Sequence, residues 1–355
     1  MTTGVFYHKA FLDHDAGYGH PERAERLVAT LELLEARHMF DGSHVRLLEP
    51  RAATIPELER VHPRGYIDLI HAASDRESRL DADTRASKGS YNAALLAAGA
   101  GLKAWDAILH GELDNAFALV RPPGHHANAT SARGFCLFNN IAVLARHITS
   151  TMPESRVFIL DVDAHHGNGT QEIFYDDPKI LYLSFHEDGR SLYPGYSGFT
   201  DEVGGGPGRG YTVNVPLPPG TSDASHLYCV RTLFPPLAEQ FRPTAILVSV
   251  GYDGHYRDSL THLALSNMAY LEISKLATKT AQKLCKGRVV MFLEGGYDLK
   301  AISESIHNTL VGLSNHGTPI DDKPPAEDPR VADYVRKLIA ETRRVLEPWW
   351  IISQT

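Results

Sequence analysis

The chain has 355 residues, of which 43% are hydrophobic and 22% charged, a composition typical of globular proteins and not of disordered ones. Its 35 basic and 43 acidic residues give a formal net charge of −8, which argues against a generic nucleic-acid binder because such proteins need a basic surface. Three cysteines, far apart and odd in number, provide neither a disulfide framework nor a paired-cysteine zinc motif.

The first residues of the sequence lack a basic stretch followed by an apolar core, so they do not resemble a secretory signal. No apolar run approaches the roughly 18 residues that a membrane-spanning helix needs. With the unpaired cysteines, these features predict a cytoplasmic protein with no membrane partner and no direct nucleic-acid partner. The sequence leaves a homo-oligomer open.

Short apolar runs alternate with longer helical patterns along most of the chain. Runs of strand length predict strands at residues 5–8, 116–120, 157–160, 180–185, 211–215, 245–250 and 289–293. Helical spacing predicts a helix that begins near Pro21, a short helix that ends near residue 175, and helices at residues 66–73, 87–108, 140–150, 223–240, 266–284, 299–314 and 329–346. The charge-rich segment 74–84 is expected to be a surface loop.

This alternation predicts an α/β protein whose parallel sheet is covered by helices on both faces. Four of the strands are followed by polar groups, in the segments 125–126 and 161–166 and at Asp253 and Tyr297. Because the carboxyl ends of parallel strands lie at one edge of a sheet, these groups can converge there. Dividing the chain between them would take the cluster apart, so we expect a single domain over residues 1–355.

The stretch after the strand at 157–160 has the highest density of potential metal ligands. It contains Asp163 and His165, and Asp253 can join them from another strand end. Two carboxylate oxygens and one imidazole nitrogen suit a divalent metal, and three protein ligands leave a fourth position free, as catalytic zinc requires. The structural alternative is that the carboxylates cap the following helix and pair with the histidines.

A metal with two carboxylate ligands acidifies its water less than an all-histidine site, so the reaction needs a separate base. His125 and His126 are the available bases. Asp161 and Asn168 are available to orient them. Tyr297 follows a Gly-Gly pair, and its hydroxyl can donate a hydrogen bond to a developing oxyanion. Together these groups predict metal-assisted hydrolysis of a carbonyl compound.

The motifs that carry these groups resemble the zinc-dependent histone deacetylase superfamily, which includes class II-like bacterial and archaeal deacetylases and acetylpolyamine amidohydrolases. They are Arg121-Pro-Pro-Gly-His-His-Ala127, Gly134-Phe-Cys-Leu-Phe-Asn-Asn140, Asp161-Val-Asp-Ala-His-His-Gly-Asn-Gly-Thr-Gln171, Ser249-Val-Gly-Tyr-Asp253 and Leu293-Glu-Gly-Gly-Tyr-Asp298. The resemblance extends over about residues 20–313. It implies the arginase/deacetylase fold, a mostly parallel sheet of about eight strands with helices on both faces, followed by a C-terminal helical extension at about 325–355.

The resemblance implies a zinc-dependent deacetylase, a hydrolase that removes acetyl or other acyl groups from acyl-lysine or related small amines. The ligands of the family's single zinc ion correspond to Asp163, His165 and Asp253, the same three residues inferred above from their positions. His126 becomes the general base and later the acid toward the leaving amine. Tyr297 matches the tyrosine that stabilises the oxyanion.

The remaining residues of the family's site fall on further positions of this sequence. Asp161 matches the carboxylate behind His125, while Asn168 stands where part of the family has a second aspartate. His166, a possible ligand at first sight, is left with a structural role. The substrate-channel residues implied are Gly134, Phe135, Tyr193, Leu260 and Gly295.

The resemblance also implies bound monovalent cations, potassium or sodium. One site would use Asp161, Asp163, His165, Ser184 and Phe185. A second would use Phe174, Asp177, Ile180 and Tyr211. Much of that coordination comes from backbone carbonyls, so the side chains support it only weakly.

Three alternatives stand beside a deacetylase of acyl-lysine. An acetylpolyamine deacetylase needs the same chemistry, but Leu260 offers no acid at the channel rim, which favours acyl-lysine. A two-manganese ureohydrolase would need further carboxylates after Ser249, where only Asp253 is present. A non-catalytic binder of acylated amines would not need the full catalytic set.

Overall fold

A computed structural model describes residues 1–352, and its centre is one sheet of eight strands. The strands are β1 (Thr3–Phe6), β2 (Val45–Leu48), β3 (Asn115–Ala118), β4 (Val157–Asp161), β5 (Ile180–Glu187), β6 (Thr212–Leu217), β7 (Ala245–Val250) and β8 (Val289–Leu293). Every strand except β2 is buried at all its positions. Burial on both faces explains why these strands are nearly continuous apolar runs, which is the usual pattern of parallel sheets.

All pairs of neighbouring strands are parallel, and the order across the sheet is β2-β1-β3-β8-β7-β4-β5-β6. At the end of β4, Asp161 is level with Ser184 of β5 and Ser249 of β7. The four strands that precede the predicted site, β3, β8, β7 and β4, are therefore consecutive in the sheet. Their carboxyl ends lie at one edge, as the sequence predicts.

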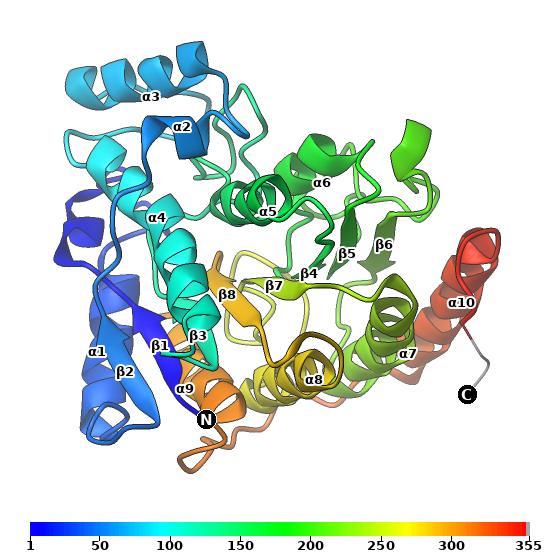
Figure 1. The fold of residues 1–355 in the computed structure, drawn as a ribbon. Helices are drawn as coiled ribbons and strands as arrows, with labels where there is room; N and C mark the ends of the chain where they lie inside the picture. Colours follow the sequence, from blue (N-terminus) through cyan, green and yellow to red (C-terminus); the bar gives the residue numbers. More distant parts are fainter. Residues whose placement is uncertain (353–355) are drawn as a thin grey trace.

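Helices cover both faces of this sheet (Figure 1). They are α1 (Glu25–Ala36), α2 (Ile55–Leu58), α3 (Arg64–Arg76), α4 (Ser90–Leu109), α5 (Asn140–Thr151), α6 (Asn168–Phe174), α7 (Asp223–Phe241), α8 (Asn267–Cys285), α9 (Leu299–Ser314) and α10 (Pro329–Leu346), with short 3-10 helices η1 (Lys9–Asp13) and η2 (Gly206–Gly208). One face is packed by α4, α5 and α6 and the other by α1, α7, α8 and α9, while α10 lies against α7 and β6. The predicted α/β fold class is confirmed.

Four short elements, β2, α2, η1 and η2, were not predicted, and one predicted loop is wrong in part. The edge strand β2 and the helix α2 were missed because four residues carry too little periodicity. Helix α3 continues to Arg76, into the segment expected to be a surface loop. Thr84, at the end of that segment, is only 2% exposed. Its hydroxyl accepts a hydrogen bond from the backbone N–H of Phe135 at 3.0 Å, so the segment packs against the site.

The C-terminal tryptophans dock on the body of the protein. Trp350 is 8% exposed, and its indole N–H donates to the carbonyl of Gly210 at 2.5 Å. Gly210 has φ +92°, and a Cβ there would meet the ring of Trp349 at 2.4 Å. All three cysteines are buried and unpaired. Within residues 1–352, no helix is both long enough and apolar enough to cross a membrane.

Candidate active site

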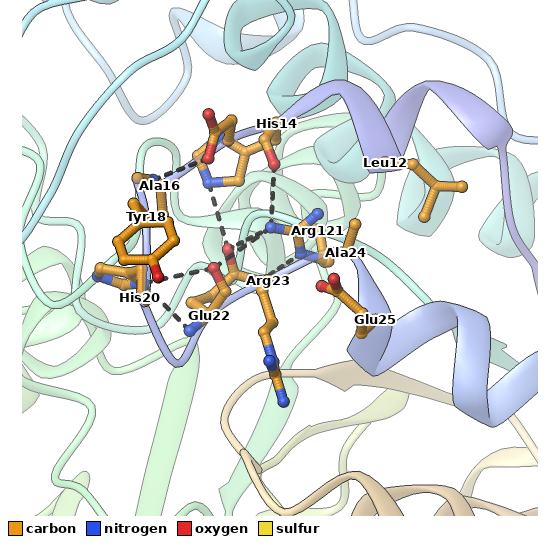
Figure 2. A pocket seen from close by; sticks show the side chains of 13 residues that line it. Leu12, His14, Ala16, Tyr18, His20, Glu22, Arg23, Ala24, Glu25 and Arg121 are labelled. Atoms are coloured by element: carbon orange, nitrogen blue, oxygen red, sulfur yellow. Dashed lines mark hydrogen bonds and ion pairs between the residues drawn. The ribbon is translucent and has the colours of Figure 1, made fainter.

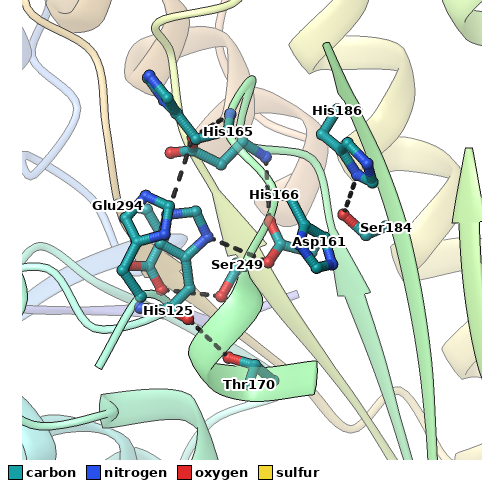
Figure 3. A network of polar contacts seen from close by, with 12 residues as sticks. His125, Asp161, His165, His166, Thr170, Ser184, His186, Ser249 and Glu294 are labelled. Carbon is teal, nitrogen blue, oxygen red and sulfur yellow. Dashed lines mark hydrogen bonds and ion pairs between the residues drawn. The ribbon is translucent and has the colours of Figure 1, made fainter. Parts of the chain in front are cut away.

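The polar groups that follow β3, β4, β7 and β8 meet at the carboxyl edge of the sheet. Figure 3 shows His125, Asp161, His165 and Glu294 gathered around the ends of these strands. The convergence confirms the main geometric prediction made from the sequence. It brings together groups from distant segments of the chain, such as His125 and Glu294, which are 169 residues apart.

Asp163, His165 and Asp253, called the metal triad below, each place one ligand atom within 4.8 Å of the others. Both carboxylates face the same ring nitrogen, because Nδ1 of His165 lies 2.8 Å from Asp253 Oδ2 and 3.2 Å from Asp163 Oδ1. Among residues 1–352, this is the only group of three histidine, cysteine or acidic side chains with such spacing. Two carboxylate oxygens and one imidazole nitrogen are a donor set that zinc accepts.

The electrostatics of the metal triad also suit a cation. Asp253 is fully buried, and burial together with neighbouring Asp163 raises its pKa to about 6. Burial opposes protonation of His165, but Asp253 and Asp163 outweigh it and raise the pKa of the imidazole to about 10. In the described part of the chain, the only cationic groups that pair with the two aspartates are histidines. Buried carboxylates without lysine or arginine partners fit a site built for a metal ion.

Two glycines make room for these carboxylates because they have no side chains. A Cβ at Gly251 would lie 1.8 Å from Asp163 Oδ2, and one at Gly295 would lie 2.3 Å from Asp253 Oδ2. Gly295 also donates its backbone N–H to Asp163 Oδ2 at 2.8 Å. Any side chain at either position would displace one of these carboxylates. Gly295, predicted to line the substrate channel, thus lies behind the metal triad.

His125 is held by a carboxylate, as predicted. Its Nδ1 lies 3.1 Å from Asp161 Oδ2, and the Tyr182 hydroxyl donates to the same oxygen at 3.0 Å. Burial lowers the basicity of His125, but Asp163 and Asp161 prevail and raise its pKa to about 10. This ring is therefore held as a hydrogen-bond donor toward Asp161.

His126 lies in a different environment from its neighbour. Its Nδ1 lies 2.8 Å from Oδ1 of Asn168, the predicted orienting residue. Burial and the nearby His125 and His165 hold the pKa of His126 well below its usual range. A neutral imidazole has a free lone pair on one nitrogen, which is what a general base needs.

A cavity of about 200 Å³ opens above these groups. Its lining contains four of the five predicted channel residues and three residues that were predicted to take part in catalysis or metal binding. The lining residues are Asp83, His126, Gly134, Phe135, His165, Leu192, Tyr193, Leu260 and Tyr297. The predicted channel walls Phe135 and Tyr193 are both present, and Leu260 is 38% exposed, as expected of a rim residue. Asp83 is an acidic lining residue that was not predicted.

Tyr297 is fixed from two sides. Asp258 accepts its backbone N–H at 2.6 Å, and the guanidinium carbon of Arg26 lies 5.1 Å from the centre of its ring. Phe135 packs edge-on against the same ring, with centroids 5.9 Å apart. Burial raises the pKa of Tyr297 well above its usual value, so the phenol keeps its proton. The hydroxyl is thus available as a donor.

Sequence reasoning missed Glu294, which is fully buried behind the histidine pair. Its carboxylate accepts the backbone N–H groups of Gly124 at 2.7 Å and His125 at 3.1 Å, and the Ser249 hydroxyl at 2.8 Å. Burial raises its pKa to about 7. The one available signal was an acidic residue immediately after an apolar strand. Glu294 ties β8, β7 and the loop after β3 together.

A second buried polar group, called the Glu22 cluster, consists of His14, Glu22, Arg26 and Arg121. Figure 2 shows His14, Glu22 and Arg121 of this cluster close together. Glu22 accepts hydrogen bonds from Nε of Arg121 at 2.5 Å and from Nη1 of Arg26 at 3.0 Å. Nε2 of His14 lies 3.3 Å from Glu22 Oε2. Arg26 also donates to the carbonyls of Glu294 and Gly296, both at 2.6 Å. The cluster therefore supports the loop that carries Tyr297. It borders a cavity of about 530 Å³.

The other predicted residues lie in ordinary structural contacts. His166 uses both ring nitrogens, with Ser197 Oγ at 2.9 Å and Gln171 Oε1 at 3.1 Å, which agrees with a structural role. At the first predicted potassium site, the Ser184 hydroxyl pairs with Nδ1 of His186 at 2.7 Å. At the second, Asp177 pairs with Arg146. The monovalent cation sites stay predictions.

Comparison with known proteins shows which family and which structures this chain resembles. The Histone deacetylase domain model matches residues 20–313. A probable deacetylase of Archaeoglobus fulgidus is 42% identical over 300 residues, which cover 84% of this chain and 82% of that protein. A histone deacetylase-like amidohydrolase of Pseudomonas aeruginosa is 38% identical over 283 residues, or 79% of this chain and 73% of that one. The crystal structure of the HDA15 HD domain superposes with a TM-score of 0.87 at 33% identity, covering 98% of this chain and 95% of that chain.

Proposed function

We propose that this chain is a zinc-dependent amidohydrolase acting on acyl-lysine. The premise is that the chain belongs to the histone deacetylase family and is a hydrolase with deacetylase activity. In this reaction an acetyl or other acyl group leaves the terminal amine of a lysine side chain or of a related small amine. The observation that carries the proposal is the cavity in which His126, His165 and Tyr297 face one space beside the metal triad.

Asp163, His165 and Asp253 would hold the zinc ion. When bound there, zinc supplies the Lewis acidity that polarises the acyl carbonyl and eases deprotonation of a water molecule. The chain's own groups supply the rest. The walls of the cavity position the acylated amine, and Gly251 and Gly295 keep the two carboxylates in place.

The proton transfers fall to His126. Its Nδ1 is engaged by Asn168, so Nε2 takes the proton of the attacking water as the oxygen bonds to the acyl carbon. The Tyr297 hydroxyl donates a hydrogen bond to the oxyanion that forms on that carbon. When the C–N bond breaks, His126 returns the proton to the departing amine, and acetate and a free amine are the products.

The residues that line the cavity support a substrate with an aliphatic chain. Phe135 and Tyr193 form aromatic walls, and Leu260 at the rim is apolar. Three acidic residues that do not line the cavity are already engaged: Asp258 accepts backbone N–H groups of Tyr297 and Asp298, Glu187 binds His262, and Asp188 pairs with Arg190.

Asp83 is the specific observation in favour of the second candidate, an acetylpolyamine deacetylase. Its carboxylate lines the cavity and can attract a second, protonated amine of a polyamine. Burial and the neighbouring Asp81 raise the pKa of Asp83. The apolar Leu260 at the rim keeps acyl-lysine the leading candidate.

The test is a comparison of rates for the zinc-loaded full chain. Acetyl-lysine peptide, acetylputrescine and acetylspermidine are supplied separately, and the acyl chain is lengthened in parallel. We expect kcat/KM to be highest for the peptide. A higher value for the polyamines would select the second candidate. If no acylated amine is hydrolysed by protein containing one equivalent of zinc, the chain is a binding protein and the proposal fails.

Monovalent cations are a further part of the proposal. Asp161 ends β4 and is level with Ser184 in the adjacent strand β5, where Phe185 follows. Titration of potassium into sodium-free and potassium-free protein should change the thermal midpoint if the carbonyls there bind the ion. An unchanged midpoint up to physiological potassium would remove this part.

A further inference from the structure

Asn168 lies between His126 and a tyrosine that none of the site motifs includes. Its Oδ1 is 2.8 Å from His126 Nδ1, and its Nδ2 donates to the hydroxyl of Tyr196 at 2.9 Å. Asn168 is 4% exposed, whereas Tyr196 is 57% exposed. The buried amide that orients the catalytic base therefore depends on a surface residue for its second hydrogen bond.

The orientation of this amide decides which nitrogen of His126 carries the proton. When Oδ1 faces Nδ1, the proton is on Nδ1 and the lone pair of Nε2 can accept a proton. The reversed amide would donate to Nδ1 and place the imidazole proton on Nε2, where it blocks the base. A carboxylate at this position would offer an oxygen in either orientation. An asparagine therefore needs a partner that holds its NH2 group away from the imidazole.

Tyr196 is itself tethered by Arg133. Nη1 of Arg133 donates to the Tyr196 hydroxyl at 2.7 Å, and its Nη2 donates to Ser131 Oγ at 3.1 Å. Ser131 bonds to Asn128 Oδ1 at 2.8 Å.

Asn128 in turn donates to Glu172 at 2.9 Å and 3.0 Å. Glu172 is one turn after Asn168 on α6, so the hydrogen bonds form a circuit that begins and ends on the same helix. A circuit of this kind restrains the Tyr196 oxygen from both sides.

We propose that Tyr196, tethered by Arg133, is a positioning residue that fixes the amide of Asn168 with its oxygen on His126 and so sets the protonation pattern of the base. This inference rests on the proposed function, in which His126 takes the proton of the attacking water. The loop that carries Tyr196 also supplies Tyr193, whose ring lies edge-on to His126 with centroids 5.0 Å apart. One loop thus provides both a wall of the cavity and the residue that orients the base.

A double-mutant cycle tests the inference. Tyr196→Phe removes the hydroxyl and is expected to lower kcat about tenfold, the size of one lost hydrogen bond to a buried group, with KM for acetyl-lysine peptide within about twofold. In protein that also carries Asn168→Asp, the same Tyr196→Phe change should lower kcat by about twofold or less. The conservative carboxylate should thus rescue the loss.

A spectroscopic readout separates positioning from general disruption. In zinc-free protein with 15N-labelled histidine, wild-type His126 should show a protonated Nδ1 and an unprotonated Nε2. Tyr196→Phe should show a mixture of both tautomers. Arg133→Met should give a smaller shift in the same direction, because the hydroxyl remains. It also serves as a second variant.

Tyr334→Phe is the matched control, because Tyr334 is 43% exposed and accepts a hydrogen bond from Arg190 at 3.4 Å, away from the cavity. It should leave kcat and the His126 spectrum unchanged. Three results would overturn the inference: an unchanged kcat in Tyr196→Phe, a rise in KM alone, or a loss of kcat that Asn168→Asp does not rescue. Inactive wild-type protein would instead refute the proposed function, and the tautomer spectrum would still decide the role of Tyr196.

Discussion

The molecule contains two buried polar clusters that lie close together and differ in how their charges are balanced. In the Glu22 cluster one carboxylate meets two guanidinium groups and a histidine. Burial opposes ionisation of Glu22, but Arg121 and His14 outweigh it and hold the pKa of the carboxyl well below its usual range. In the metal triad, two carboxylates face one imidazole. The pKa of Asp253 is raised by burial and by Asp163, whereas His125 and His165 outweigh burial and lower the pKa of Asp163.

The difference distinguishes a structural cluster from a site. Buried charges that satisfy one another stabilise the surrounding backbone, and removing one of them leaves the others unpaired. Buried carboxylates in excess repel one another until a cation arrives, so such a cluster gains most from a bound metal. The Glu22 cluster should therefore matter mainly for folding, and the metal triad mainly for metal binding and turnover.

The largest expected effect follows removal of a ligand. Asp253→Ala should lower zinc content to well below one equivalent and reduce turnover by about 10³-fold or more, because the chemistry depends on Lewis acidity at this position. The unfolding free energy of the zinc-free protein should change less than in the Glu22 variant below. Metal analysis and urea unfolding of the same preparations measure both quantities. Full zinc content in the variant would contradict the assignment of the triad.

Glu22→Gln should have the opposite profile. It leaves Arg26 and Arg121 buried without a charged partner, so we expect the unfolding free energy to fall by about 3–5 kcal/mol. Zinc content should stay at one equivalent in protein that is kept folded at low temperature. If zinc is lost while the urea midpoint is unchanged, the contrast between the two clusters is wrong.

The pH dependence of stability sharpens the same contrast. Because the folded-state pKa of Glu22 is depressed, its stabilisation is fully present above the unfolded pKa of about 4.3 and is lost as pH falls toward the lower folded value. The stability gap between wild type and Glu22→Gln should therefore be constant at neutral pH and narrow below about pH 4. Urea midpoints measured across this range provide the test.

Removing the oxyanion donor should affect turnover without affecting either metal or fold. Tyr297→Phe should lower kcat by about 10²-fold, with one equivalent of zinc and an unchanged thermal midpoint. His126→Ala should give a loss of similar size, because it removes the base. Near-wild-type rates in both variants with an acetyl-lysine peptide would refute the mechanism.

The smallest expected effect is steric. Gly295→Ala places a Cβ 2.3 Å from Asp253 Oδ2, so the ligand must shift, and we expect zinc affinity to fall by about 10–100-fold. Gly42→Ala is the matched control, because nothing lies within 4 Å of a Cβ there. Competition with a chromophoric zinc chelator measures both affinities. Equal affinities would show that the site adapts to the added methyl group.

The sequence predicts the sheet and the site because both depend on local signals. Apolar runs of strand length mark β4 and β7, and polar residues directly after them mark the metal triad. The parallel arrangement then brings Asp163 and Asp253 together without any need to know the strand order.

Features that depend on contacts between distant segments were not predictable. Glu294 has its role because two distant segments direct three donors at it, and Asp83 lines the cavity because the 74–84 segment folds back against Phe135. The Glu22 cluster joins residues 99 positions apart. Neither periodicity nor residue type at one position indicates such partners.

The strand order has a consequence for how the protein is made. β7, which precedes Asp253, lies between β4 and β8, although it is synthesised long after β4. A chain growing on the ribosome therefore carries Asp163 and His165 well before it can supply the third ligand. Parallel pairing over such separations is slow to form, so assembly of the complete triad is a late step of folding. If the triad holds zinc as proposed, a nascent chain that still lacks Asp253 should bind the ion more weakly than the folded protein.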